Sequence, residues 1–244
     1  ITIFPGPKLG TNVVKVENLS KSYPDKLLYE DLSFTLPAGG IIGIIGPNGA
    51  GKTTLFDLIV GKAAPDSGSI TLGETVKLSY VDQVRMMDSS QTLLELIGQG
   101  RDVLKIGDRE MNVREYLSKF NFSSKEHLKP VNILSGGEKN RAYLALTLQA
   151  GGNVLLLDEP TNDLDVYTIH ALEEALLDFA GSVVVISHDR YFLDRLCTHI
   201  LAFEGESQVK WWEGNFSDYE ENKLARLGEK ALIPKRISYR KLTR

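Results

Sequence analysis

The clearest pattern along the chain is a set of three short runs that are almost entirely apolar. They cover residues 41–45, 154–157 and 183–186 and consist of Ile, Val and Leu, with one Gly in the first run. A strand that is apolar on both faces must lie between two layers, as strands do in a parallel sheet covered by helices. Segments with helical spacing of apolar residues separate the runs. The pattern therefore predicts an α/β fold with a mainly parallel core sheet flanked by helices.

A second group of strand-like segments alternates between apolar and polar residues. These segments lie at residues 13–16, 33–36, 69–72 and 77–81, and turn chemistry such as P-D-S-G at 65–68 connects them. Alternation of this kind is typical of strands with one buried face. We expect an antiparallel β subdomain beside the core sheet.

The region between residues 85 and 132 is more polar and mainly helical in pattern. We predict a helical subdomain at about 85–150, since apolar residues recur there at helical spacing: Leu93, Leu94, Leu96 and Ile97, then Val113, Tyr116, Leu117 and Phe120. The chain has no internal repeat, so each motif described below occurs once.

Composition fits one large α/β domain, because 244 residues with 42% hydrophobic content can bury a substantial core. No run approaches the ~18 apolar residues of a membrane span. Residues 1–7 lack the basic segment and apolar core of a signal peptide. We expect no membrane insertion. The single cysteine, Cys197, suits a reducing compartment, the cytoplasm. The first residue, Ile1, predicts that the chain was cut from a longer polypeptide.

Charge is distributed unevenly along the chain. Residues 223–244 carry eight Lys and Arg against one Glu, a net charge of +7, whereas the whole chain has −4 and the remainder therefore −11. The acidic body should avoid polyanions, while the tail could contact one. The alternative is an ordinary solvated terminus.

Residues 46–53 match the phosphate-loop pattern G-x-x-x-x-G-K-[ST], with an apolar strand before them and a helical segment after them. Glycines allow backbone N–H groups to surround the β- and γ-phosphates of a nucleotide, while Lys52 supplies positive charge and Thr53 can bind Mg²⁺. The alternative is an ordinary Gly-rich turn, which the placed Lys52 and Thr53 disfavour. The predicted nucleotide contacts are Gly46, Asn48, Gly49, Ala50, Gly51, Lys52, Thr53 and Thr54.

Two acidic residues, Asp158 and Glu159, follow the apolar run 154–157 directly. A buried strand is a rigid support that brings both carboxylates to the rim of the sheet, where phosphate chemistry would take place. The alternative is a solvent-facing acidic pair, which becomes improbable beside a phosphate loop. The turn 160–165 follows, and either Asp163 or Asp165 is expected to cap the next helix.

Residues 135–138 read S-G-G-E, which matches a capping box in which Ser135 and Glu138 fix the start of a helix. Two glycines directly after a cap weaken the helix. In return they expose bare backbone N–H groups at the positive end of the helix, which is a site for an anion. We expect Gly136 and Gly137 to serve that purpose.

The phosphate loop, the L-S-G-G-E segment at 134–138 and the acidic strand end together resemble the ATP-binding cassette (ABC) ATPases, a P-loop NTPase family. The resemblance implies that ATP and Mg²⁺ bind, that Asp158 holds the metal and that Glu159 orients or deprotonates the attacking water. It also implies that the segment with Ser135, Gly136 and Gly137 completes an ATP site on a second cassette. One chain alone should then be catalytically incomplete.

Three single residues acquire a role through the same resemblance. Gln83 matches the glutamine that senses Mg²⁺ and the attacking water, His188 matches the histidine that contacts the γ-phosphate, and Tyr23 matches the aromatic that stacks on adenine. On the residues alone, Gln83 would be a surface side chain and His188 a polar loop residue. Tyr23 would cover the core at a strand end.

The E-P-T-N-D-L-D sequence at 159–165 and the L-S-G-G-E-K-N-R sequence at 134–141 resemble the ABC-F branch of the family. This resemblance implies that the chain is the second cassette of a two-cassette protein. Residues 1–12 would end the linker between cassettes, residues 13–216 would form the ABC domain, and residues 217–244 would be a helical, basic extension. The second cassette would belong to the same longer chain, or two fragments would pair head to tail.

For function, the ABC-F resemblance implies a nucleotide-dependent clamp on the ribosome that regulates translation, with rRNA and tRNA as partners. The main alternative is the ATPase subunit of a membrane ABC transporter, which would use the same site. A scaffold that binds ATP without turnover is disfavoured by Glu159, Gln83 and His188. A purely RNA-binding protein is disfavoured by the acidic body.

Overall fold

The computed structural model describes the chain apart from residues 2, 4–5, 81–89, 107–108 and 229–244. In the described part, the core sheet has the strand order β11-β10-β3-β9-β8-β5. All neighbours are parallel except β10 and β11, which form an antiparallel pair. The strands are β3 (Ile41–Ile45), β5 (Leu78–Ser79), β8 (Val154–Asp158), β9 (Ser182–Ile186), β10 (His199–Gly205) and β11 (Gln208–Glu213).

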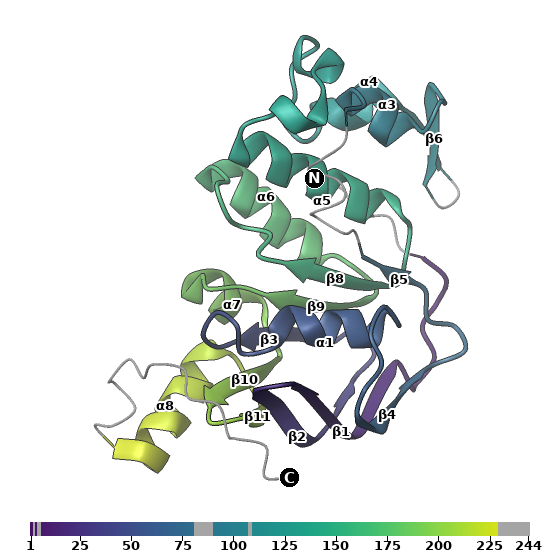
Figure 1. Cartoon of the computed structure of the whole chain (residues 1–244). Helices are drawn as coiled ribbons and strands as arrows, with labels where there is room; N and C mark the ends of the chain where they lie inside the picture. The colour runs from purple at the N-terminus through teal and green to yellow at the C-terminus, as the bar shows by residue number, and fades with distance from the viewer. Residues whose placement is uncertain (2, 4–5, 81–89, 107–108, 229–244) are drawn as a thin grey trace.

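The core sheet separates two hydrophobic cores, as the three apolar runs predict. Along β8, Leu155 and Leu157 pack into the core that includes the helices α5 (Gly136–Gln149), α6 (Val166–Leu177) and α7 (Arg190–Leu196). Val154 and Leu156 face the opposite core, which includes α1 (Lys52–Ile59). Figure 1 shows β8 and β9 between α1 and the α5–α6 pair. The predicted α/β architecture is confirmed.

The antiparallel subdomain is also confirmed, with one exception. Strands β1 (Val14–Tyr23), β2 (Lys26–Leu36) and β4 (Ser67–Leu72) form an antiparallel sheet of order β2-β1-β4. The assignment of 77–81 to this sheet is wrong, since β5 pairs in parallel with β8 in the core sheet. β5 has only two residues, which is too short to show whether apolar and polar residues alternate. The sequence pattern therefore could not assign it to one sheet or the other.

The part of the chain between β5 and β8 is mainly helical where it is described, and it contains α3 (Leu93–Gly98), α4 (Val113–Ser118) and α5. Two short 3₁₀ turns, Glu126–Leu128 and Val131–Ile133, lead into α5. A hairpin of β6 (Val103–Ile106) and β7 (Arg109–Asn112) interrupts the helices, which the sequence pattern did not predict. Helix α8 (Phe216–Leu227) packs on α7 at the other end of the molecule. Among the described helices, none has the length and apolar character needed to cross a membrane.

Candidate nucleotide site

The phosphate loop joins β3 to α1, and its backbone requires glycine at two positions. Gly46 has φ 144°, and a Cβ there would lie 2.6 Å from Cβ of Phe203 on β10. Gly51 is the N-cap of α1 with φ 102°, and its Cβ would lie 3.0 Å from Leu28 on β2. Both values of φ lie where L side chains are strained. The loop is therefore pressed between β10 and β2, with the N–H groups of the first turn of α1 at its end.

Lys52, the first residue of α1, is 7% exposed and points back over the loop. Its ammonium donates to the carbonyl oxygens of Gly46 at 2.5 Å and Pro47 at 3.3 Å. Burial lowers the pKa of Lys52, and the nearby carboxylates of Glu159 and Asp158 partly oppose this effect. The loop thus carries a partly desolvated positive charge at its centre, where a phosphate would bind.

Thr53 and Asp158 come together as the phosphate loop and the acidic strand end predict. The Thr53 hydroxyl donates to Asp158 Oδ2 at 2.9 Å. The backbone N–H of Asp158 donates to the buried hydroxyl of Tyr143 on α5 at 3.0 Å, which fixes the end of β8. Burial is the main cause that raises the pKa of Asp158. A cation bound beside this carboxylate would offset the free-energy cost of burying its negative charge.

Glu159 and His188 face each other at the same edge of the sheet. His188 Nε2 lies 3.3 Å from Glu159 Oε1, and the His188 backbone N–H donates to Glu159 Oε2 at 3.3 Å. Glu159 has φ 47°, and its N–H donates to the carbonyl of Ile186 at 2.8 Å. His188 Nε2 also lies 3.1 Å from Oδ1 of Asn48 in the phosphate loop. Burial raises the pKa of Glu159, while His188 lowers it, so the carboxylate is a stronger base than a solvated one.

These residues line one cleft of about 350 Å³. The predicted contacts Tyr23, Asn48, Gly49, Gly51, Lys52, Thr53, Thr54, Asp158 and Glu159 are among its walls. His188 adjoins it through Asn48 and Lys52. Sequence reasoning missed Lys26, Leu28 and Ile186, which also line the cleft. The signal for Lys26 and Leu28 was their place on the strand after Tyr23, and that for Ile186 was its place at the end of the apolar run before His188. Gln83 lies outside the described residues.

The donor set of the cleft fits a nucleoside triphosphate with Mg²⁺. The loop and Lys52 suit phosphate oxygens. The Thr53 hydroxyl and Asp158 carboxylate are oxygen ligands of the kind Mg²⁺ prefers. Within the described residues, no three His, Cys, Asp or Glu side chains gather into a metal cluster. Mg²⁺ does not require one, because nucleotide phosphates and water complete its shell.

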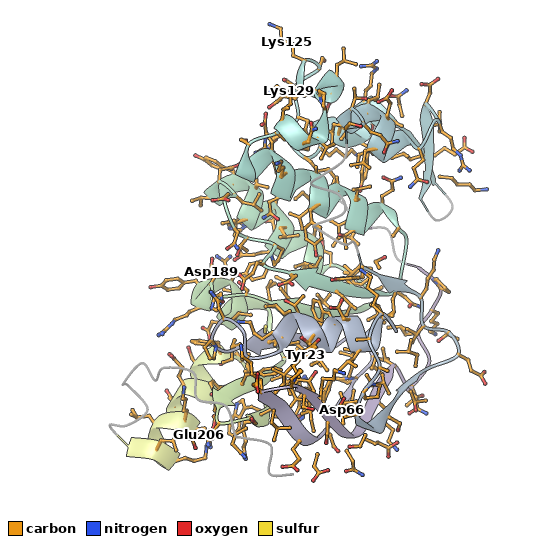
Figure 2. The ribbon with its side chains drawn as sticks, viewed as in Figure 1. Tyr23, Asp66, Lys125, Lys129, Asp189 and Glu206 are labelled. Carbon is orange, nitrogen blue, oxygen red and sulfur yellow. The ribbon has the colours of Figure 1, made fainter. Side chains whose placement is uncertain are left out.

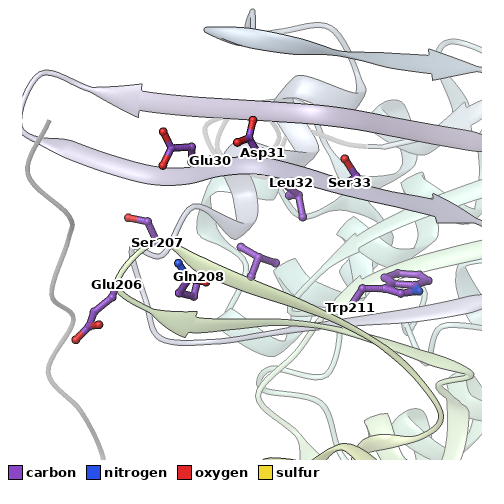
Figure 3. A pocket seen from close by; sticks show the side chains of 9 residues that line it. Glu30, Asp31, Leu32, Ser33, Glu206, Ser207, Gln208 and Trp211 are labelled. Atoms are coloured by element: carbon purple, nitrogen blue, oxygen red, sulfur yellow. The ribbon is translucent and has the colours of Figure 1, made fainter. Parts of the chain in front are cut away.

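A second cleft, of about 260 Å³, is lined by three acidic side chains and, among the described residues, by no lysine or arginine. Figure 3 shows it between β2 and the β10–β11 hairpin, with the carboxylates of Glu30, Asp31 and Glu206 around it and Trp211 at one end. Three carboxylates repel phosphate groups. This cleft is therefore unsuited to a nucleotide.

The S-G-G-E segment begins α5 as predicted. Ser135 is the N-cap: its hydroxyl accepts from the N–H of Glu138, and the Glu138 carboxylate accepts from the N–H of Ser135. The capping box is confirmed. The ammonium of Lys129 donates to Glu138 Oε1 at 2.8 Å, which lowers the pKa of Glu138 to about 2. Asp165 caps α6 by accepting from the N–H of Thr168, so of the two predicted candidates it is the capping residue.

The two glycines of this segment have a structural cause inside the same chain. A Cβ on Gly136 would lie 2.8 Å from Asp163 Oδ2, and a Cβ on Gly137 would lie 2.5 Å from the Asp163 carbonyl oxygen. The buried amide of Asn140 holds the same turn by donating to the carbonyls of Pro160 at 2.9 Å and Asn162 at 2.6 Å. The glycines thus permit close packing of α5 on the turn 160–165. The anion site expected at these glycines stays a prediction.

The segment 135–137 does not line the nucleotide cleft of its own chain. Among the hydrogen bonds between described residues, those of the Ser135 N–H and hydroxyl go to Glu138, and its carbonyl accepts from the N–H of Lys139 in the same helix. The structure thus brings together Lys52, Thr53, Asp158, Glu159 and His188, and leaves Ser135, Gly136 and Gly137 at a separate place.

Comparisons with known proteins agree with this geometry. A family model described as "ABC transporter" matches residues 29–162. The chain is 58% identical over 243 residues to the energy-dependent translational throttle protein EttA of Escherichia coli strain K12, covering 99% of the chain and 44% of that protein. EttA of Mycobacterium tuberculosis strain H37Rv is 57% identical over 249 residues, with 100% and 45% covered.

The chain therefore spans less than half the length of these curated relatives. Among solved structures, cbiO1 from Clostridium perfringens, part of the ABC transporter complex cbiONQ, has the same fold. Its TM-score is 0.62 at 21% identity, with 91% of this chain and 98% of that chain covered. The chain belongs to the ABC transporter family, and over its whole length it is similar to one ATP-binding cassette of the ABC-F protein EttA.

Proposed function

We propose that this chain is an ATP-hydrolysing cassette of an ABC-F protein that regulates translation. The observation that carries the proposal is the convergence of Lys52, the Thr53–Asp158 pair and the Glu159–His188 pair on one cleft. Positive charge, oxygen ligands and a general base are the groups that phosphoryl transfer to water requires.

Each group has a role that follows from its position. Lys52 would leave the carbonyls of Gly46 and Pro47 and donate to phosphate oxygens instead. Thr53 and Asp158 would hold Mg²⁺, which when bound neutralises charge that develops on the phosphates. Glu159 would accept a proton from the attacking water, and His188 beside it would keep that carboxylate in position. Gln83 remains a predicted contact of the metal and the water.

The partner we propose is a second cassette, either in the same longer protein or in a head-to-tail pair of this chain. The separate location of Ser135, Gly136 and Gly137 supports this proposal, because these residues start a helix and do not line the cleft that their own chain forms. N–H groups at a helix start stabilise an anion. They would contact the terminal phosphate held by the other cassette.

The role in translation follows from the relatives' printed name, a translational throttle protein. We propose that two cassettes close around ATP, hold the ribosome and reopen after hydrolysis, which requires that ATP favours the closed state. Contacts with rRNA and tRNA and a cytoplasmic location remain predictions. The basic tail 223–244 is a candidate for rRNA contact, and its residues 229–244 lie outside the described part of the chain.

The test is Glu159→Gln in the protein that contains both cassettes. Hydrolysis should slow by about 10²–10⁴, the usual contribution of a positioned general base, while ATP binding is retained. Glu206→Gln, which removes an acid from the other cleft, is the matched control and should keep wild-type turnover. Unchanged hydrolysis in Glu159→Gln would remove Glu159 from the proposed role.

Ribosome cosedimentation of the same variant tests the translation role. Retention on ribosomes with ATP but not with ADP supports the clamp, because slowed hydrolysis should prolong the closed state. Retention that does not depend on the nucleotide contradicts it. Copurification with a membrane protein instead would favour the transporter ATPase, the alternative that the family description suggests.

A further inference from the structure

Tyr23, the residue proposed to stack on a base, lies at an exposed hairpin tip. It is the last residue of β1, it pairs with Lys26 across the tip of the β1–β2 hairpin, and it is 48% exposed. A side chain at a hairpin tip has few neighbours of its own to fix it. Its position must therefore come from the groups that hold the strand end.

Asp66, in the turn before β4, holds that strand end from outside the hairpin. Its Oδ2 accepts from the backbone N–H of Ser22 at 2.6 Å and from the Ser22 hydroxyl at 2.6 Å. Its own N–H donates to the carbonyl of Ser20 at 2.9 Å. The pairing of β4 with β1 ends at the Ser20–Ser67 pair. Beyond that pair, the Asp66 carboxylate takes the place of a backbone carbonyl of β4 as the acceptor for β1. The contacts to β1 therefore continue as far as Ser22, the residue before Tyr23.

Lys21 adds a contact to the Tyr23 ring itself. Its ammonium lies 5.5 Å from the ring centroid, within the range of a cation–π interaction. The same ammonium donates to Asp66 Oδ1 at 3.2 Å and to the carbonyl of Ala64 at 2.9 Å. Tyr23 lines the nucleotide cleft and Lys21 does not. The cation therefore contacts the ring without itself lining the cleft.

The turn that carries Asp66 is also tied to the phosphate side of the cleft. It follows α1, whose first residue is Lys52, and the N–H groups of Lys62 and Ala63 both donate to the carbonyl of Asp57 in that helix. Figure 2 labels Asp66 and Tyr23, which lie in the same part of the molecule, near α1 and the β1–β2–β4 sheet. The Ser22 hydroxyl is the main cause that lowers the pKa of Asp66, so the carboxylate stays ionised at neutral pH.

We propose that Asp66 is a positioning residue for the nucleotide base. Together with Lys21 it holds Tyr23 at a fixed place relative to the phosphate loop, so that the ring stacks on the base of a nucleotide whose phosphates lie at Lys52. This inference rests on the proposed function, because it needs Tyr23 to contact the base.

The experiment compares two probes on the 244-residue chain by titration calorimetry: ADP with Mg²⁺, and tripolyphosphate with Mg²⁺, which has no base. Tyr23→Ala should weaken ADP binding by about 5- to 150-fold, which is ~1–3 kcal/mol of stacking expressed as a ratio. Asp66→Ala should weaken it by about 3- to 10-fold, as expected if the ring is correctly placed in roughly a tenth to a third of molecules. Both variants should bind tripolyphosphate within about twofold of the wild type, the scatter of such a measurement.

Two further variants separate charge from position. Asp66→Asn keeps an acceptor for Ser22 but loses the ion pair with Lys21, so ADP affinity should fall between those of the wild type and Asp66→Ala. Asp25→Asn removes the same charge from the exposed hairpin turn and should bind both probes normally. If Asp66→Ala does not fold, Asp66→Asn serves as the test variant, with the same two probes.

The outcomes distinguish failure of the inference from failure of the proposed function. If Tyr23→Ala weakens ADP binding and neither Asp66 variant does, Asp66 has no positioning role and stacking on Tyr23 stands. If the Asp66 variants weaken both probes equally, the role of Asp66 is structural and the inference is overturned. If Tyr23→Ala leaves ADP binding unchanged, the proposed base contact fails, and the positioning role fails with it.

Discussion

The most informative single change is Gly137→Ala, because the structure and the family resemblance explain this glycine differently. A Cβ at this position would lie 2.5 Å from the carbonyl oxygen of Asp163, about 0.9 Å closer than the 3.4 Å at which ordinary contacts begin. The oxygen belongs to a turn that Asn140 holds through two hydrogen bonds. It cannot move aside easily. Overpacking of this kind costs about 1–3 kcal/mol.

Helix propensity acts in the opposite direction, since Ala in a helix is favoured over Gly by up to about 1 kcal/mol. Gly98→Ala is a matched control that isolates the packing cost. Gly98 also lies in a helix, and a Cβ there would meet Val113 at 3.4 Å, an ordinary contact. Because both variants gain a similar propensity term, we expect Gly137→Ala to be less stable than Gly98→Ala by about 1–3 kcal/mol.

Equilibrium unfolding in urea measures this difference, provided that the slope m is the same for both variants. Equal free energies of unfolding for the two variants, within about 0.5 kcal/mol, would refute the packing argument. Gly137 would then be explained by its proposed contact with a phosphate alone. A clear difference would show that close packing on Asp163 constrains the residue, whatever else it binds.

Two other variants test the same region. Asn140→Ala removes both hydrogen bonds to the turn and leaves the carbonyls of Pro160 and Asn162 without that donor. The free energy of unfolding, measured in urea, should therefore fall by about 1–3 kcal/mol. A loss under ~0.5 kcal/mol would mean that other contacts hold the turn. Glu138→Gln concerns pH. Since the folded-state pKa of Glu138 is depressed to about 2, its ionised form stabilises the fold fully above the unfolded value near 4.5 and loses this effect as pH falls toward 2. The wild type should therefore lose more stability than the variant between these pH values in thermal melts, and parallel pH profiles would contradict the role of the Lys129 contact.

Local motifs made much of the site predictable from sequence. The phosphate loop, the strand before the acidic pair, the capping box of Ser135 and Glu138, and the cap at Asp165 each depend on residues close together in the chain. Their backbone geometry follows from glycine, from β-branched runs and from short polar side chains. For these elements the structure reproduces the predictions.

Contacts between distant segments could not be predicted in this way. The hydroxyl of Tyr143 accepts from the N–H of Asp158, and Lys129 donates to Glu138. Neither pair leaves a periodic signal, because each depends on how a helix packs on a strand or a loop. The glycines after Ser135 show the same limit. Sequence alone related them to an anion, whereas their nearest neighbour in the structure is Asp163.

The turn 159–165 connects the two functional parts of the chain. Its first residue is the proposed base Glu159, Asp163 packs against Gly137, and Asp165 starts α6. Glu159 and Asp163 belong to the same short turn, so we expect an Ala at position 137 that displaces Asp163 to shift Glu159 as well. Loss of hydrolysis in Gly137→Ala is therefore not proof that Gly137 contacts a phosphate. That conclusion requires normal stability in the variant together with weakened pairing of the two cassettes.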